Sequence, residues 1–239
     1  MEAANLIIDI GNTALKAAWA DGMTLGKTFR YQGERMLDFI LSLTEKTKPN
    51  VMILSSVRTF SKQAVEKLRN ECTRLIIIDE NILERYDVPS YLSPDRAASI
   101  IASRYLFKKR GCTIFDLGTT LTVDFLDPEG RYEGGNVSLG CRTRFKALNR
   151  YAKPLPLLGA AEDISQKGTD IASSITSGVI SGIMFEIDGY MSRNPENITV
   201  FTGGDAIYFA KRMKNSIFVV CNLVLMGLAL IADRYDKKD

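Results

Sequence analysis

The chain has 239 residues, of which 46% are hydrophobic and 25% charged, and its formal net charge is +3. This balance is typical of a globular protein with one large domain or two smaller ones, and without a long basic run we expect no nucleic-acid partner. The chain contains no histidine, which excludes Ser-His-Asp and Cys-His catalysis and histidine-ligated zinc. A general base would therefore be a carboxylate or a lysine.

The N-terminus lacks the basic segment and cleavage site of a signal peptide. The apolar stretch 217–232 is shorter than the ~20 residues that span a bilayer and is interrupted by Asn222, so we predict a short strand, then a buried helix, and no membrane partner. Scattered thiols without a C-x-x-C pair are typical of a reducing compartment, and we predict a cytoplasmic protein. The thiols are Cys72, Cys112, Cys141 and Cys221.

The first predicted element is a hairpin over residues 5–22, whose two apolar runs flank the turn Asp9-Ile-Gly11-Asn-Thr13. Glycine permits the backbone of a tight turn, and the turn amides can bind an anion. Asp9 can hold magnesium through water, and Lys16 can neutralise a phosphate. Because Asp-Gly-Asn turns also occur in ordinary hairpins, this turn alone leaves a purely structural role open.

After the hairpin, helical and strand patterns alternate, which predicts an α/β layer architecture. A turn-rich segment then leads into a further helix. The predicted elements are a helix at 35–46, a buried parallel strand at 51–57, a helix at 61–72 capped by Ser61, a strand at 74–79, the turn-rich segment at 86–96 and a helix at 97–109.

The second half opens with a similar hairpin at 113–130, whose turn reads Asp116-Leu-Gly118-Thr119-Thr. Thr122 and Asp124 follow on its outgoing strand. The later predicted elements are a polar loop at 134–148 that turns helical, a surface loop at 152–159, a long helix of small residues at 171–191 and a strand, Gly-Gly turn and helix at 197–213.

Because each half begins with the same hairpin, we predict two related domains, 1–111 and 112–239, that face one cleft. Two phosphate-binding turns in such a cleft would hold a nucleotide from opposite sides. A third motif, Thr202-Gly-Gly-Asp205-Ala206, follows an apolar strand and opens a helix, where an anion is favoured. The three motifs together favour nucleotide binding over a structural role.

The order of these motifs resembles the actin-like ATPase superfamily, a duplicated α/β fold shared by sugar kinases, heat-shock chaperones and actin. Within it, the chain looks most like the type III pantothenate kinases, over nearly its whole length. Shorter matches are Ser55-Ser56-Val57, Tyr86 nine residues before Asp95, and Ser93-Pro94-Asp95-Arg96. The resemblance implies two ribonuclease H-like domains that enclose a nucleotide cleft.

The resemblance implies that ATP phosphorylates the terminal hydroxyl of pantothenate, the first step of coenzyme A biosynthesis, in a homodimer. Asp95 would be the catalytic base, Asp9 the magnesium site reached through water, and Asp116 the site of a potassium or ammonium ion. The implied ATP-binding residues are Asp9, Ile10, Gly11, Asn12, Thr13, Ala14, Leu15, Lys16 and Thr119. The implied pantothenate-binding residues are Tyr86, Ser93, Pro94, Asp95, Arg96 and Ile171.

Elementary chemistry agrees with this role of Asp95, since phosphoryl transfer needs a carboxylate to orient the hydroxyl and a helix start favours negative charge. Ser-Pro-Asp is also a common helix start, so a capping role stays open. Three positions depart from the family: Ser93 replaces a glycine, Leu139 replaces a proline before Gly140, and Ile171 stands where the family has a pantothenate-contacting threonine. Isoleucine cannot donate that hydrogen bond, and Thr169 or a nearby serine is the expected substitute.

Two other functions stay open from sequence. One is a non-catalytic nucleotide-binding regulator on the same scaffold, since the family includes a protein first described as a transcription accessory factor. The other is a kinase for a different small hydroxylated acid. The retention of Asp9, Asp95 and Asp116 favours catalysis over the first of these.

Overall fold

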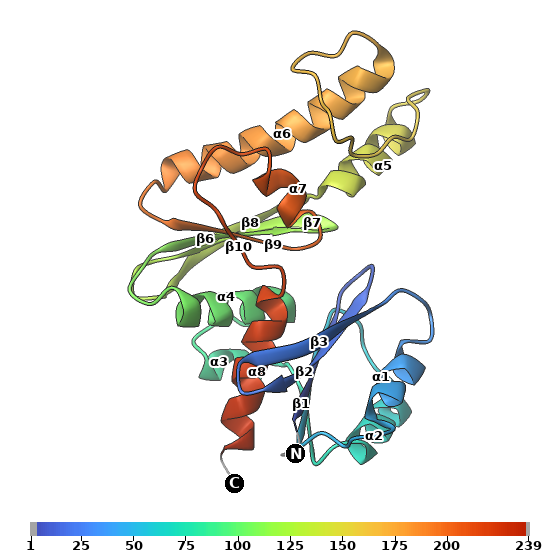
Figure 1. The fold of residues 1–239 in the computed structure, drawn as a ribbon, viewed down its shortest axis with the longest axis vertical. Helices are drawn as coiled ribbons and strands as arrows, with labels where there is room; N and C mark the ends of the chain where they lie inside the picture. Colours follow the sequence, from blue (N-terminus) through green and yellow to red (C-terminus); the bar gives the residue numbers. More distant parts are fainter. Residues whose placement is uncertain (1–3, 238–239) are drawn as a thin grey trace. The chain divides into compact units, whose positions relative to one another are not determined.

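The computed structural model describes residues 4–237. Contacts divide the chain into two compact units: unit 1 runs to Leu106 and resumes at Asn222, and unit 2 is Phe107–Cys221. Each unit is built on one five-stranded sheet (Figure 1). The predicted division into 1–111 and 112–239 concerns the two repeats and stays a prediction, whereas by contacts the C-terminal helix packs with the first half.

The sheet of unit 1 has the strand order β3-β2-β1-β4-β5. The first three strands form an antiparallel meander, and β4 and β5 continue the sheet in parallel. The strands are β1 (Asn5–Ile10), β2 (Leu15–Asp21), β3 (Thr24–Tyr31), β4 (Val51–Ser56) and β5 (Arg74–Ile77). Every residue of β1 is buried, as expected of a central strand covered on both faces.

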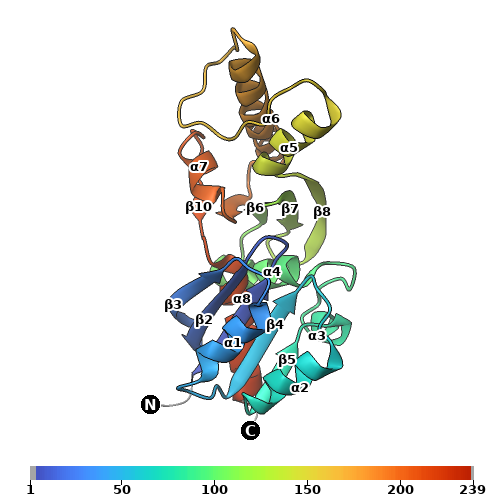
Figure 2. The same cartoon turned by 90° about the vertical axis from the view of Figure 1, so that its right-hand side faces the viewer.

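Helices cover both faces of this sheet, as Figure 2 shows, with α1 and α2 in front of the strands and α8 behind. Ile40 of α1 and Leu68 of α2 pack against alternate residues of β1. Helix α8 also packs along α4. The helices of unit 1 are α1 (Met36–Thr44), α2 (Lys62–Asn70), α3 (Glu80–Arg85), α4 (Pro94–Leu106) and α8 (Leu223–Asp236). The predicted cap of α2 is confirmed, because Ser61 Oγ accepts a hydrogen bond from Ala64 N at 3.2 Å.

The sheet of unit 2 has the order β10-β9-β6-β7-β8, which repeats the topology of unit 1 strand for strand. Its first three strands are again an antiparallel meander, and β9 and β10 again run parallel to the first strand. The strands are β6 (Cys112–Leu117), β7 (Thr120–Leu126), β8 (Tyr132–Leu139), β9 (Ile198–Thr202) and β10 (Phe218–Val219). The predicted repeat of the hairpin therefore extends to a whole sheet.

Three helices pack on one face of the second sheet: α5 (Cys141–Tyr151), α6 (Ile171–Arg193) and α7 (Ala206–Ala210). Phe145, Ile183 and Phe209, one from each helix, share a core with the buried side chains of β6 and β7. The long helix α6 begins at a capping box, in which Asp170 and Ser173 satisfy each other's backbone amides.

Three elements differ from the sequence-based expectation. The predicted loop at 134–148 is wrong in its first part, because Gly134–Leu139 belongs to strand β8 and only the later residues are helical. Strand β3 and helix α3 were not expected either. Strands β8 and β3 lie at sheet edges, where each pairs with a single neighbour, β7 or β2. Such pairing can form an edge strand even where the alternation of apolar residues is weak.

The predicted buried helix after Asn222 is confirmed as α8, which is apolar because it lies between the sheet and α4 of unit 1. Within residues 4–237 no helix combines the length and the hydrophobicity that crossing a membrane requires.

Candidate functional site

Asp9 lies near the carboxyl end of β1, the central strand of unit 1. It pairs in register with Lys16 on β2 and Ser55 on β4, and residues paired in register project from the same face of a sheet. Ser55 Oγ donates a hydrogen bond of 3.0 Å to Asp9 Oδ1, and the two residues are 1% and 8% exposed. The carboxylate is thus fixed by a buried hydroxyl and lies beside a lysine.

The turn that follows Asp9, Gly11–Ala14, closes through a hydrogen bond of 3.1 Å from Gly11 N to Ala14 O. Asn12 is exposed at its tip, and Arg58 donates a hydrogen bond of 3.0 Å to Asn12 O. The flanking predicted ATP-binding residues Ile10 and Leu15 are fully buried core residues. They can therefore meet a ligand through their backbone alone.

Asp95 lies in the first turn of α4 and is half-buried. Its Oδ1 accepts a hydrogen bond of 3.0 Å from Arg96 N, and it makes no other hydrogen bond to residues 4–237. The helix begins with a bond of 3.0 Å from Ala97 N to Ser93 O. The predicted segment Ser93–Arg96 therefore presents a carboxylate at a helix N-terminus, where negative charge is stabilised.

Tyr86 lies at the other end of α4, where Arg104 donates a hydrogen bond to Tyr86 O. The guanidinium of Arg234 lies 5.4 Å from the centre of the Tyr86 ring, and the hydroxyl is buried without a hydrogen-bond partner among residues 4–237. Burial raises the pKa of this phenol, and Arg234 offsets part of the rise. A cavity of about 280 Å³ beside it is lined by Arg85, Tyr86, Arg234 and Tyr235, so Asp95 does not contribute to it.

In unit 2, Asp116 occupies the position on β6 that Asp9 has on β1. Its partners in register are Thr122 on β7 and Thr202 on β9, so two hydroxyl side chains replace the lysine and serine of unit 1. Thr122 Oγ1 is buried and has no hydrogen-bond partner among residues 4–237. No group of three or more acidic, cysteine or histidine side chains that suits a metal ion occurs in that part of the chain.

The turn after Asp116 is packed against the start of α5. Thr119 O accepts hydrogen bonds from Gly140 N at 3.1 Å and from Thr143 Oγ1 at 2.6 Å, while Gly118 N donates to Thr120 O at 3.0 Å. A Cβ on Gly140 would lie 1.9 Å from Gly118 O, so only glycine fits there. The helix therefore begins directly against the turn.

The Thr-Gly-Gly-Asp motif packs on the same turn. Gly203 has φ +92°, and a Cβ there would lie 2.5 Å from Asp116 Oδ1 and from Leu117 O. Asp205 N donates a hydrogen bond of 2.9 Å to Leu117 O, and burial raises the pKa of the Asp205 carboxyl. The structure thus brings the second and third predicted motifs together in unit 2.

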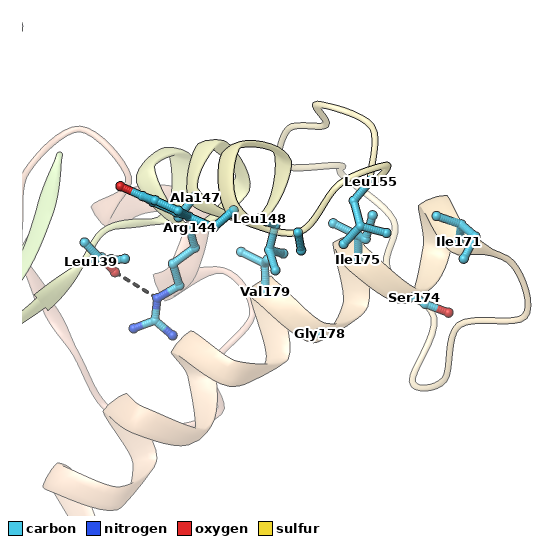
Figure 3. A pocket seen from close by; sticks show the side chains of 12 residues that line it. Leu139, Arg144, Ala147, Leu148, Leu155, Ile171, Ser174, Ile175, Gly178 and Val179 are labelled. Atoms are coloured by element: carbon cyan, nitrogen blue, oxygen red, sulfur yellow. Dashed lines mark hydrogen bonds between the residues drawn. The ribbon is translucent and has the colours of Figure 1, made fainter.

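Ile171 begins α6 and is 60% exposed. It lines an apolar groove of about 780 Å³ between α5 and α6 (Figure 3). The lining residues are Leu139, Arg144, Ala147, Leu148, Tyr151, Ala152, Leu155, Ile171, Ser174, Ile175, Gly178 and Val179. Ser174 belongs to the lining, whereas Thr169, an expected substitute for the family threonine, does not. Arg144 closes one end through a hydrogen bond of 2.8 Å from Nε to Leu139 O.

A family model described as type III pantothenate kinase matches residues 5–193. The chain belongs to this family. A curated type III pantothenate kinase from Azobacteroides pseudotrichonymphae is 35% identical over 240 residues, covering 98% of this chain and 97% of its own. This family membership confirms the resemblance that the motifs indicated.

Solved structures extend the likeness to the fold. A putative Baf family transcriptional activator from Campylobacter jejuni has a TM-score of 0.66 at 20% identity and covers 97% of this chain and 99% of its own. MreB 5 of Spiroplasma citri, solved with AMPPNP, has a TM-score of 0.53 at 12% identity, with 99% and 98% covered. The predicted α/β fold class, two related actin-like units, is confirmed.

Three polar contacts of this family member were not predicted. Ser55 was noticed as part of a short match, but its bond to Asp9 depends on the parallel pairing of β1 with β4. Arg58 was missed altogether, and Thr122 was named on the outgoing strand but without its buried hydroxyl, which has no hydrogen-bond partner among residues 4–237. The spacing of Asp116 and Thr122 across a three-residue turn could have indicated the latter pair, because it places them opposite each other in a hairpin.

Proposed function

We infer that the protein transfers the γ-phosphoryl group of ATP to the terminal hydroxyl of pantothenate, which yields 4'-phosphopantothenate for coenzyme A biosynthesis. The single observation that carries this inference is the family match over residues 5–193. The chain also retains the carboxylates Asp9, Asp95 and Asp116. A regulator without catalysis is not favoured, since nothing in the chain explains why it would keep all three.

We propose that the turn of unit 1 binds the ATP phosphates. The amides and exposed side chains of Gly11–Ala14 offer hydrogen-bond donors, and Lys16 supplies a positive charge on the same face as Asp9. In unit 2, Thr119 is proposed as a further ATP-binding residue, on a turn whose backbone is held by Gly140 and Thr143. Charge neutralisation and positioning are the main requirements of phosphoryl transfer.

Magnesium fits Asp9. Mg²⁺ prefers oxygen ligands, keeps several waters and is commonly held by one or two carboxylates together with the phosphates of the substrate. Asp9 supplies one carboxylate, and Ser55 Oγ fixes its orientation at 3.0 Å. When bound, the ion neutralises charge on the phosphates. Ser55 then acts as a positioning residue for Asp9.

A monovalent cation fits Asp116. Potassium and ammonium suit a site with one carboxylate and neutral oxygens, and Asp116 lies opposite Thr122, whose buried hydroxyl lacks a partner among residues 4–237. Such an orphaned polar atom calls for a water or an ion. In the strand register the neighbours of Asp116 are Thr122 and Thr202, rather than a lysine as for Asp9.

Asp95 is the proposed general base. Its Oδ1 is engaged by Arg96 N, which leaves Oδ2 to accept the proton of the attacking hydroxyl. Arg96 and the segment from Ser93 hold the pantothenate beside it. We propose that Tyr86 also contacts pantothenate. Its hydroxyl is buried beside Arg234, so this contact requires the Tyr86 side chain or the Arg234 side chain to move. Ile171 is proposed as well, as an apolar contact.

We also propose a homodimer in which α6 packs against a second copy. Ile171, Gly178 and Phe185 recur every seven residues along α6, a spacing typical of helix pairs. Phe185 is 72% exposed, and the apolar groove of Figure 3 continues this surface. Light scattering after size-exclusion chromatography should show a dimer, with Phe185→Glu shifted to monomer. A dimer of unchanged mass in the variant would contradict this surface.

A cytoplasmic location is proposed from the thiols. The four cysteines are free, and Cys72, Cys112 and Cys141 are buried. Burial raises the pKa of Cys112 and Cys141 to about 11, so both remain protonated thiols. Such a set is expected in a reducing compartment.

The kinase assignment is tested with purified protein, ATP, magnesium, potassium and a panel of small hydroxylated acids, with ADP release as the readout. Pantothenate should be the preferred acceptor, and mass spectrometry should detect phosphopantothenate. Asp95→Asn should lower the transfer rate by about 10²–10⁴-fold, to a small residual rate, while retaining the melting temperature. Preference for another acid would revise the substrate, and absence of ADP release with every acceptor would overturn the assignment.

A further inference from the structure

Helix α8 makes an unusually close crossing with α4 in unit 1. A Cβ placed on Gly227 of α8 would lie 1.9 Å from Ala98 O, 2.5 Å from its carbonyl carbon and 2.9 Å from its Cα. All three atoms are backbone, so no side-chain rotation can relieve the overlap. Any residue larger than glycine at position 227 must push the two helices apart.

The crossing lies close to the proposed catalytic base. Ala98 is three residues after Asp95 on α4, which is slightly less than one helical turn, or about 4.5 Å along the axis. The backbone of a hydrogen-bonded helix moves as a unit over such a distance. A displacement of α4 at Ala98 is therefore passed on to the carboxylate of Asp95.

The opposite side of α8 packs on the sheet that carries Asp9. Its contacts include β1, which ends at the proposed phosphate-binding turn, and β4, which carries Ser55. Helix α8 thus packs on both the strand with Asp9 and the helix with Asp95, while α4 also contacts β4 directly. A wider α8–α4 crossing would therefore displace the helix that carries Asp95 relative to the strand that carries Asp9.

The surroundings of the crossing are built for close packing. Ser99 and Ser103 on α4 are 2% and 0% exposed, and their hydroxyls find no hydrogen-bond partner among residues 4–237. Gly227 is itself buried in the interior of α8, where glycine is a poor helix former. The buried serine hydroxyls and the glycine inside a helix both lower the stability of the fold. We infer that small side chains are present here because the two helices must pack closely.

We propose that Gly227 is a positioning residue for the reaction: by allowing α8 and α4 to pack at backbone contact, it sets the distance of Asp95 from the phosphate-binding turn at Asp9. The proposal rests on the role of Asp95 as general base. An in-line transfer tolerates little displacement of the group that orients the attacking hydroxyl, so a shift of about 1 Å can cost two orders of magnitude in rate.

The test is Gly227→Ala in the full-length protein, assayed with ATP and pantothenate at a temperature where circular dichroism shows the variant folded. We expect kcat to fall at least about tenfold, with the KM for ATP within about twofold of the parent value, because the turn that binds ATP is not part of the crossing. The control is Gly159→Ala in the exposed loop before α6, where an added Cβ meets nothing within 4 Å. It should keep the parent kcat.

A double-mutant cycle separates positioning from general disruption. If Gly227 acts through Asp95, Gly227→Ala should not lower the residual rate of Asp95→Asn any further. Equal fractional losses in both backgrounds, or a parent-like kcat in folded Gly227→Ala, overturn the proposal. A fully active Asp95→Asn would instead remove the proposed base and leave the kinase assignment untouched.

A milder variant covers the case in which Gly227→Ala does not fold. Ala98→Ser adds one atom to the same buried crossing, and we expect kcat to fall about threefold with an unchanged KM for ATP. A folded Ala98→Ser with parent kinetics, beside an unfolded Gly227→Ala, would assign the crossing to stability alone and reject the positioning role.

Discussion

The two sheets have the same strand order, yet the aspartates at the ends of their central strands have different neighbours. Asp9 lies between Lys16 and Ser55, whereas Asp116 lies between Thr122 and Thr202. A carboxylate beside a lysine suits a site that binds phosphate and magnesium together. A carboxylate among hydroxyls suits a single monovalent cation. The repeated topology supplies the position of each aspartate, and we propose that its cross-strand partners determine which ion it favours.

The two turns differ in the same sense. The turn of unit 1 leaves Asn12 and Thr13 exposed and is held from outside by Arg58. The turn of unit 2 also exposes Thr119 and Thr120, but backbone packs on its inner side, since Gly140 and Gly203 both approach it too closely for a side chain. Both turns can offer side chains to a ligand, and the second is held in addition by a rigid backbone frame.

The variant with the largest expected effect is Asp9→Asn, which tests the proposed role of the unit 1 aspartate. We expect kcat to fall about 100-fold or more, because the charge that we propose holds magnesium against the phosphates is lost. The amide can still accept the Ser55 hydrogen bond, so the melting temperature should change little. Initial rates across a magnesium titration measure the effect, with Asp21→Asn at the exposed end of β2 as the control. A rate within about twofold of the parent would remove Asp9 from the phosphate site.

The next test converts the surroundings of Asp116 into those of Asp9. Thr122→Lys places an ammonium opposite the carboxylate, where it competes with the proposed cation. We expect about a tenfold loss of rate and, for the remaining activity, no response to potassium. Rates are measured against potassium chloride at constant ionic strength, with Asn136→Lys at an exposed position of β8 as the control. A parent-like potassium titration in folded Thr122→Lys would assign the cation to another site.

Much of this comparison was accessible from the sequence. The two hairpins, the parallel strand at 51–57 and the helix starts at Ser61 and after Asn222 follow from apolar periodicity and capping residues, which act locally. Strands β3 and β8 could not be predicted in this way, since edge strands are stabilised by pairing with a neighbour rather than by their own apolar pattern.

The residues of the candidate site also differ in how far the sequence could predict them. Asp9 and Asp116 could be singled out because each shares a motif with a glycine turn. The partners that distinguish them could not, because Ser55 and Thr202 reach the aspartates through parallel pairing between distant segments. The close crossing at Gly227 depends on contact between helices more than a hundred residues apart, which no local pattern encodes.

A smaller effect is expected for Ser55→Ala. The variant removes the 3.0 Å hydrogen bond to Asp9 Oδ1 and leaves the carboxylate in place. Loss of such a supporting bond typically weakens metal binding about tenfold, so the magnesium concentration at half-maximal rate should rise by about that factor. The response to potassium should not change, since unit 2 is untouched. Ser42→Ala, on the exposed side of α1, is the control. Equal shifts in both titrations would mean that the two sites are not separate.

The smallest expected effect is that of Thr122→Val on the melting temperature. It separates the two aspartates most directly, because the difference between variant and parent should change when the cation is added. Thr122 Oγ1 is buried and lacks a partner among residues 4–237, so replacing it by the methyl group of Thr122→Val removes a desolvation cost of about 1 kcal/mol. In potassium-free buffer the variant should therefore melt at the parent temperature or slightly above it. With potassium added, the parent should gain stability by ligand binding and the variant should gain less. If potassium stabilises both equally, the Thr122 hydroxyl is not a ligand, and the difference between the two aspartates must lie in Thr202 and the surrounding backbone.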